Sequence, residues 1–325
     1  MTISTKPLPG TLDGTQPGFL DEAAASFYRE QGYLVVENAF SADEVAAING
    51  EAVDICRGKY GTFDGWGGPH DHDTDTDVLK QYHCIHFPHK LSPTINGHLA
   101  HPRIVETLTG VIGPDVKCMQ SMLFIKASGK PGQAWHQDED YIPTRDRSLA
   151  GAWIALDDAT IDNGCLWIIP GSHRHGVLWP QEFQDHPDYD CAEKSVGFPY
   201  TEDDAVPVEV KAGSIVFFNG YLLHRSLPNR APAGKFRRTL VNHYMSASSL
   251  LPWVHGLVNH GTFIDHNQTV AKADVRDIVM IAGRDPYARM GITDTNQPHV
   301  RTIGDGGCAK GANAGRHKKD PTKYA

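Results

Sequence analysis

The chain has 325 residues, of which 40% are hydrophobic and 21% charged, so it can bury a sizeable core. Its formal net charge of −9 at pH 7 argues against a general binder of nucleic acid or anionic membranes, which would carry a basic stripe. No stretch approaches the roughly 18 apolar residues that a membrane-spanning helix requires.

Cysteine spacing and the chain ends favour a cytoplasmic protein. The six cysteines lie far apart and form no CxxC pair, which in a chain of this length indicates reduced thiols. The N-terminus lacks the apolar segment of a secretory signal, and the C-terminus is not a peroxisomal or retention tripeptide.

Three helices are predicted before residue 113. In the first of them, residues 20–32, apolar residues recur at helical spacing. Ser41 precedes two acidic residues and is expected to cap its helix. Residues 1–17 are rich in Pro, Gly and Thr and predict a flexible arm. The expected elements are helices over 20–32, 41–57 and 101–112 and a short strand over 33–36.

A polar loop is expected over residues 58–78, which contain five Gly and five Asp. Loops of this length in compact domains are usually functional lids or disordered segments. We predict a lid that closes over a bound substrate, with Trp66 as its apolar anchor and candidate substrate contact. A permanently solvated surface loop is the alternative.

From Val116 onwards the sequence is typical of a β-sandwich or closed barrel, because short apolar runs alternate with turns. Within residues 250–300, the segment Val270–Ala282 is the best helix candidate. The tail from Gly304 is Gly-rich and basic and is expected to be mobile. The predicted strands cover 116–125, 150–156, 165–169, 206–210, 214–218 and 239–245.

These patterns predict one mainly β domain with flanking helices. It spans residues 18–300, with the barrel core at about 116–246 and a C-terminal extension over 247–300. A flexible arm over 1–17 and a flexible tail over 301–325 lie outside it.

The motif His136-Gln137-Asp138 follows a turn containing Gly and Pro and is the sharpest chemical signal. On an extended segment, the first and third side chains share one face because strand side chains alternate. One imidazole and one carboxylate can supply two ligands of a 2-His-1-carboxylate iron triad. His224, after a buried strand and an Asn-Gly turn, is the best candidate for the third; a core histidine bonded to a backbone carbonyl is the alternative.

Two adjacent arginines, Arg237 and Arg238, begin an apolar strand, so one is expected to point inward. A buried guanidinium needs a carboxylate partner. That partner is either a protein carboxylate or a ligand carboxylate held in a bidentate fork.

Six motifs stand in a fixed order along the chain: HQD, DNGC, PGSH, GSIVFF, HRS and FRR. Together with the N-terminal FYREQGYLVVENAFSADEV, they resemble the phytanoyl-CoA dioxygenase family of Fe(II)/2-oxoglutarate-dependent oxygenases, from about Phe19 to Ser246. The resemblance implies a double-stranded β-helix, a jelly-roll barrel related to the cupins. It also implies Fe(II) as the metal and 2-oxoglutarate and O₂ as cosubstrates.

The resemblance further implies roles for individual residues. It makes His136, Asp138 and His224 the iron ligands and Arg237 the partner of the distal 2-oxoglutarate carboxylate. The loop before Arg237 is two residues longer than the shorter family loops, which leaves Arg238 as a rival. The same resemblance places Ser226, Trp153 and Lys126 beside the cosubstrate.

The predicted function is hydroxylation of an unactivated C–H bond of a small metabolite or natural product, with release of succinate and CO₂. Desaturation and epoxidation stay open. The alternatives are a cupin-like metalloenzyme that does not use 2-oxoglutarate and a non-catalytic binding barrel. Residues that flank the motifs are candidate substrate contacts: Trp135, Gln137, Tyr141 and Trp179.

Overall fold

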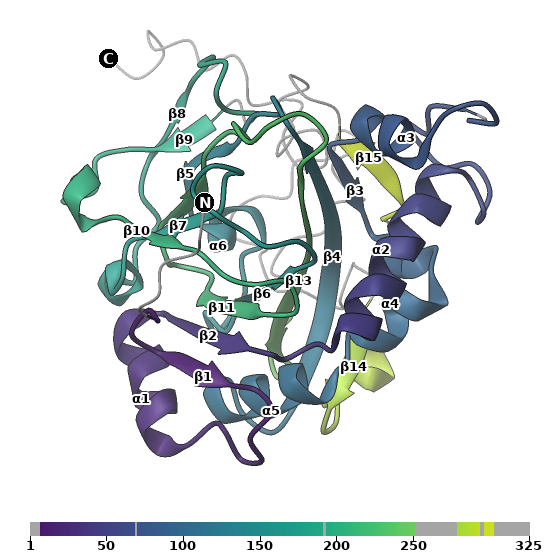
Figure 1. The fold of residues 1–325 in the computed structure, drawn as a ribbon. Helices are drawn as coiled ribbons and strands as arrows, with labels where there is room; N and C mark the ends of the chain where they lie inside the picture. Colours follow the sequence, from purple (N-terminus) through teal and green to yellow (C-terminus); the bar gives the residue numbers. More distant parts are fainter. Residues whose placement is uncertain (1–6, 69, 191–192, 251–277, 293–295, 302–325) are drawn as a thin grey trace, which may run out of the picture.

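The computed structural model describes residues 7–68, 70–190, 193–250, 278–292 and 296–301 (Figure 1). The helices are α1 (Glu22–Gln31), α2 (Ala42–Cys56), α3 (Asp75–Gln81), α4 (Pro93–His98), α5 (Pro102–Val111) and α6 (Asp138–Tyr141). Short 3₁₀ turns are η1 (Pro88–Lys90), η2 (Ser172–His175), η3 (Glu202–Asp204) and η5 (Ala288–Met290).

Most strands belong to two sheets. The large sheet has the order β1-β2-β11-β6-β13-β4-β3-β15, with β14 also paired to β4. Its strands are β1 (Thr11–Asp13), β2 (Tyr33–Glu37), β3 (Cys84–His86), β4 (Val116–Ala127), β6 (Ala150–Ala155), β11 (Ile215–Asn219), β13 (Phe236–Ser246), β14 (Val279–Ala282) and β15 (His299–Arg301).

The small sheet has the order β10-β7-β12-β5. Its strands are β5 (Gln133–His136), β7 (Leu166–Ile168), β10 (Val206–Val208) and β12 (His224–Ser226). A separate hairpin joins β8 (Gln181–Phe183) to β9 (Glu193–Ser195). The two facing sheets form the double-stranded β-helix that the sequence predicts, although the sheets do not close into a continuous barrel.

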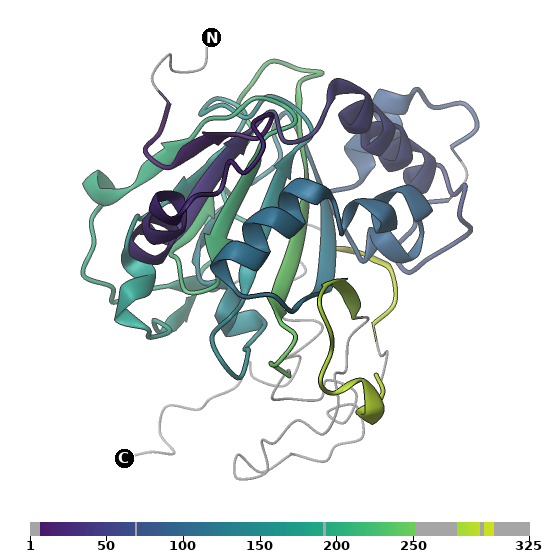
Figure 2. The ribbon, with the colours of Figure 1, turned by 90° about the horizontal axis from the view of Figure 1, so that it is seen from below.

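Strand alternation divides the core into two layers. On β2, for example, Leu34 and Val36 pack in one cluster with the helices, whereas Tyr33 and Val35 pack in a second cluster between the sheets. Helices α1, α2, α4 and α5 contribute apolar side chains to the first cluster, and Figure 2 shows helices on this face of the large sheet. The opposite face is therefore left to form the interior between the two sheets.

Helix α2 begins as the sequence predicts. The Ser41 hydroxyl accepts a hydrogen bond from the Glu44 backbone N–H at 3.3 Å, and the Glu44 carboxylate accepts one from the Ser41 N–H at 2.8 Å. This reciprocal capping box satisfies two backbone donors that the helix itself cannot pair.

Replacing Ser41 with alanine is expected to lower the free energy of unfolding by about 1 kcal/mol, because the cap is lost. Urea denaturation of the metal-free protein would measure it. Ser26→Ala, inside α1, is the matched control: alanine has the higher helix propensity there, so no loss is expected. Equal stability of wild type and Ser41→Ala would contradict the account of this cap.

The structure corrects three predictions. Thr11–Asp13 lies within the expected arm yet forms β1, parallel to β2. The expected loop over 58–78 ends early, because Thr74 caps α3, which begins at Asp75. The predicted helix Val270–Ala282 lies mostly outside the described residues, and its described end is strand β14, held by pairing with β4.

Four cysteines in the described part of the chain are buried and form no disulfide there: Cys56, Cys84, Cys118 and Cys165. None of the helices in the described ranges combines the length and apolarity needed to cross a membrane.

Candidate metal centre and adjoining pocket

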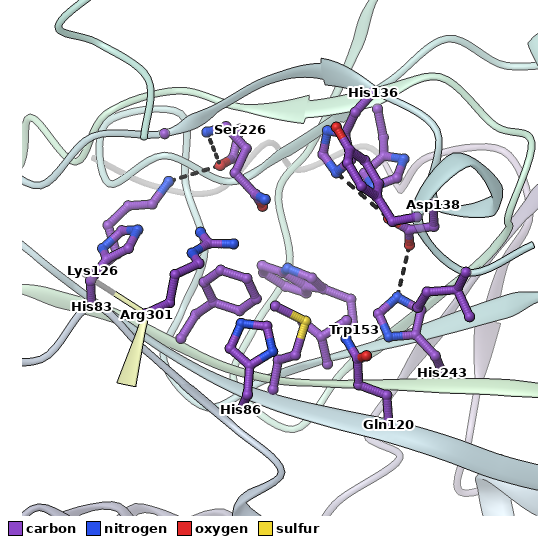
Figure 3. A pocket seen from close by; sticks show the side chains of 18 of the residues that line it. His83, His86, Gln120, Lys126, His136, Asp138, Trp153, Ser226, His243 and Arg301 are labelled. Carbon is purple, nitrogen blue, oxygen red and sulfur yellow. Dashed lines mark hydrogen bonds and ion pairs between the residues drawn. The ribbon is translucent and has the colours of Figure 1, made fainter. Parts of the chain in front are cut away.

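A cavity of about 530 Å³ lies between the two sheets, a volume in the range of small-molecule sites. Strands β4 and β13 of the large sheet line one side, and β5 and β12 of the small sheet contribute to the other. Figure 3 shows polar side chains from both sheets pointing into it.

His136, Asp138 and His224 meet at one end of this cavity. Each offers a ligand atom, and these atoms all lie within 4.8 Å of one another. Asp138 Oδ1 lies 3.6 Å from His136 Nε2 and 3.5 Å from His224 Nε2. The cluster has the composition of the 2-His-1-carboxylate facial triad of non-haem iron oxygenases.

Strand pairing explains why residues so distant in sequence converge. His136 ends β5 and lies directly opposite His224, the first residue of the antiparallel strand β12. Gln137 keeps an extended backbone, with φ −128° and ψ 126°, so the alternation carries through to Asp138 at the start of α6. The sequence argument that the first and third residues of the motif share a face thus applies, although Asp138 itself is helical.

Backbone carbonyls orient both imidazoles. His136 Nδ1 lies 2.8 Å from the Ala134 carbonyl, and His224 Nδ1 lies 2.9 Å from the Leu222 carbonyl. A carbonyl can only accept, so each Nδ1 must carry a proton, and each Nε2 is the nitrogen that faces Asp138. Both Nε2 atoms are therefore set to bind a metal.

The charges of the cluster suit a divalent cation. Burial lowers the pKa of His136 to about 4. Burial alone would raise the pKa of Asp138, but His224 and His243 hold it well below its usual value. His136 is therefore neutral and Asp138 ionised at neutral pH, as metal binding requires. Burial alone would lower the pKa of His224, but the charge of Asp138 raises it, and a bound metal would take the place of the His224 Nε2 proton.

His243 was not singled out from the sequence. Its Nε2 donates to Asp138 Oδ2 at 2.9 Å, which turns the other oxygen of Asp138 toward the two ligand histidines. Strand alternation could have identified it. Every second side chain of β13 faces the same side, and Arg237, Val241 and His243 all line the cavity.

Replacing His243 with alanine is expected to weaken Fe(II) binding roughly 10–100-fold, the usual cost of losing an outer partner of a metal ligand. His243→Gln keeps an N–H donor and should lose less. Anaerobic Fe(II) titration would measure the effect, with His175→Ala as the control, because His175 is exposed and bonded to Tyr200. Wild-type affinity in His243→Ala would show that Asp138 needs no such support.

The two arginines at the start of β13 point in opposite directions. Arg238 forms a bidentate pair with Asp157, with nitrogen–oxygen distances of 2.8 and 2.6 Å. Arg237 is buried and lines the cavity, and it forms no ion pair with any carboxylate of the described residues. Its bond to Thr239 Oγ1, at 3.0 Å, leaves Arg237 Nε buried without a partner. An anionic ligand would satisfy that charge.

Lys126, Ser226 and Trp153 lie beside Arg237, where the family resemblance expects them. Lys126 is the direct cross-strand neighbour of Arg237, and its Nζ donates to Ser226 Oγ at 3.0 Å. The Arg237 guanidinium lies 5.5 Å from the centre of the Trp153 ring. Burial, and next the charge of Arg237, lower the pKa of Lys126 well below its usual value. The potential at this end of the cavity is therefore positive.

Of the five predicted substrate contacts, Tyr141 alone lines the cavity. Trp135 faces the Arg225 guanidinium, 4.5 Å from the ring centre. The Gln137 amide donates to two carbonyls, and its oxygen accepts from the backbone N–H of Trp179. These interactions give Gln137 a structural role behind His136 and Asp138, which sequence proximity alone could not distinguish from substrate contact.

Trp66 also lies outside the cavity lining. Its indole N–H donates to the Cys56 carbonyl at 2.9 Å, which fastens the polar loop to the end of α2. The loop nevertheless reaches the cavity through Asp64 and Gly65. Trp66 is thus an anchor of the loop, and closure of the loop over a substrate stays a prediction.

The phytanoyl-CoA dioxygenase (PhyH) family model matches residues 28–239, more than half of the chain. The chain belongs to the phytanoyl-CoA dioxygenase family. It is accordingly a 2-oxoglutarate-dependent non-haem iron dioxygenase, with Fe(II) as its metal and 2-oxoglutarate and O₂ as its cosubstrates.

Curated relatives with different named substrates match the chain. Phytanoyl-CoA dioxygenase 1 of Oryza sativa subsp. japonica is 29% identical over 259 residues, covering 69% of this chain and 89% of that protein. Phytanoyl-CoA dioxygenase of Arabidopsis thaliana is 30% identical, covering 65% and 84%. Ectoine dioxygenase of Bordetella bronchiseptica is 27% identical, covering 71% and 77%. These names do not agree on one substrate for this family member.

Solved structures share the fold. The apo form of the non-haem monooxygenase ThoJ superposes with a TM-score of 0.59 at 22% identity, covering 86% of this chain and 88% of ThoJ. The epimerase SnoN, solved with Fe³⁺, α-ketoglutarate and nogalamycin RO, gives a TM-score of 0.53 at 22% identity, covering 71% and 87%. At this identity the likeness concerns the fold alone.

Proposed function

We propose that this enzyme hydroxylates an unactivated C–H bond of a small metabolite or natural product and releases succinate and CO₂. The observation that carries the proposal is the presence, within one cavity, of the His136–Asp138–His224 cluster and of Arg237, whose charge no carboxylate of the described residues pairs. A metal site and an anion site in one cavity are what a chelating dicarboxylate such as 2-oxoglutarate requires.

His136, Asp138 and His224 fit Fe(II) in donor type and mutual distance. When bound there, the iron would supply the O₂ chemistry that oxidises the substrate. The protein's part is to present three ligands from one side, so that the opposite side stays open to the cavity. His243 fixes the carboxylate that belongs to this set.

Arg237 is the proposed partner of the distal carboxylate of 2-oxoglutarate, and a guanidinium fork suits a carboxylate geometrically. Lys126 and Ser226 are joined by a hydrogen bond beside it and would complete the polar end of the cosubstrate site. Trp153 would cover the carbon chain, since its ring lies against the guanidinium. Burial keeps water away from these groups and strengthens the electrostatic contacts.

The position of Asp138 favours hydroxylation. In related halogenases, as the family resemblance implies, a small residue takes this place and leaves room for halide. Here a carboxylate fills it, held by His243. Desaturation and epoxidation differ from hydroxylation in their products, so product analysis separates them.

The decisive experiment is a reaction under ¹⁸O₂ with a metabolite panel, followed by mass spectrometry of the product. Hydroxylation predicts one added oxygen, labelled from O₂, together with one succinate per product. A product that has lost two hydrogens would identify desaturation, and turnover without succinate would contradict 2-oxoglutarate use. A cytoplasmic location and the absence of nucleic-acid or membrane partners stay predictions from the sequence.

A further inference from the structure

Strand β15 lies beyond residues 28–239, the segment matched by the family, yet it forms part of the pocket. It pairs antiparallel with β3, which pairs antiparallel with β4. The large sheet is thereby extended by two strands past its central pair β13–β4. The cross-strand rows are Met122–His86–His299 and Phe124–Cys84–Arg301.

These rows point His299 and Arg301 into the cavity. Residues in direct register share a face of the sheet, and Met122 and Phe124 face the interior between the sheets. His299 and Arg301 both line the cavity accordingly. In Figure 3, Arg301 extends into the cavity from the side of His83 and Lys126, across from His136 and Asp138.

Arg301 is a buried cation fixed in position. Only 5% of its surface is exposed, and one terminal nitrogen pairs with Asp190 Oδ2. The same oxygen lies 2.6 Å from His83 Nε2, so Asp190 joins β15 to His83, the residue just before β3. Its guanidinium also lies over the Phe124 ring, 5.2 Å from the centre.

The chemistry of this position suits an anionic group. A guanidinium has five N–H donors in a rigid plane, a geometry that matches the two oxygens of a carboxylate. The positive potential described for Lys126 includes a contribution from Arg301, whereas Asp190 opposes it. A cation in a partly closed, low-dielectric cavity attracts an anion more strongly than one in water.

We propose that β15 is the substrate-selecting strand of this enzyme and that Arg301 binds a carboxylate group of the substrate. The inference rests on the proposed function, because it takes the metal and cosubstrate sites as assigned. Arg301 would hold the acid at the wall opposite the metal ligands, and the C–H bond to be oxidised would lie between. The His299 ring stacks on the His86 ring, with 4.5 Å between the ring centres, and would form a wall of the same part of the cavity.

The test uses small α-amino acids and short carboxylic acids, each paired with its own carboxamide. Calorimetric titration of the full chain, loaded anaerobically with Fe(II) and 2-oxoglutarate, measures binding without turnover. Stimulation of succinate release in air then measures catalysis separately. Selective binding of an acid over its carboxamide supports the inference even where succinate release fails, and that failure would count against the proposed function alone.

Arg301→Gln is expected to weaken binding of the selected acid by roughly 30-fold or more, the usual result of removing one partner of a desolvated charge pair. Because Asp190 would then lose a partner, Arg301→Gln combined with Asp190→Asn tests the same contact without a lone buried carboxylate. Both variants should shift affinity for the acid far more than affinity for 2-oxoglutarate. Arg289→Gln, an exposed arginine of the same extension, is the control and should behave as wild type.

Three results would overturn the inference. The first is equal binding of an acid and its carboxamide by the wild type. The second is wild-type affinity for the acid in a folded double variant. The third is a loss of 2-oxoglutarate affinity equal to the loss for the acid, which would assign Arg301 to the cosubstrate site instead.

Discussion

Replacing His136, Asp138 or His224 with alanine is expected to abolish oxidative turnover. Two remaining ligands hold Fe(II) poorly, so the loss should exceed the roughly 10–100-fold expected for an outer partner such as His243. Succinate formation and Fe(II) content, measured on the same preparation, would show both effects together. The fold should survive, because none of the three residues belongs to the two large apolar clusters.

Asp140→Ala is the matched control for Asp138→Ala, because Asp140 is an exposed carboxylate of the same short helix. It should retain iron and activity. Full activity in any triad variant would remove that residue from the metal site. The unfolding midpoints of the metal-free variants should equal that of the metal-free wild type, which would show that a loss of activity does not come from misfolding.

The second large effect is expected at Arg237. Truncating one member of a buried charge pair costs about 3–5 kcal/mol. Arg237→Ala should therefore raise the 2-oxoglutarate requirement by roughly 10² to several 10³-fold. Fe(II) affinity should change far less, since Arg237 is not among the clustered metal ligands. Initial rates of succinate release over a range of 2-oxoglutarate concentrations would measure the change.

Arg238→Ala supplies the control from the adjacent position. Arg238 pairs with Asp157 outside the cavity lining, so its loss should leave the 2-oxoglutarate requirement near the wild-type value. The opposite pattern, with the large effect at Arg238, would reverse the assignment of the two arginines. Arg237→Lys should recover part of the loss, because it keeps the charge without the planar fork.

The placement of His136 and Asp138 on one face was predictable from sequence because its physics is local. A histidine and an aspartate two residues apart share a face wherever the backbone is extended, and the structure keeps Gln137 extended. Strand alternation likewise required one of Arg237 and Arg238 to point inward. Which of them does so depends on the register of β13 against β4 and β6, and this pairing is not encoded in the local sequence.

The missed residues depend on long-range register. His243 reaches Asp138 only because β13 keeps one register with β4 from Arg237 to His243; the register shifts between His243 and Tyr244. Arg301 enters the cavity through the pairing of β15 with β3, more than 200 residues earlier in the chain. Conversely, Trp135 and Gln137 neighbour the ligands in sequence, and the same alternation that aims the ligands inward turns these two away.

The most direct test of the account measures succinate release from 2-oxoglutarate by the full chain, with and without Fe(II) and with and without O₂. The account predicts succinate only when iron, 2-oxoglutarate and oxygen are all present. It also predicts that His224→Ala and Arg237→Ala release none at the 2-oxoglutarate concentration that saturates the wild type. Succinate at an unchanged rate in His224→Ala, or none from a wild type shown to hold both Fe(II) and 2-oxoglutarate, would contradict it.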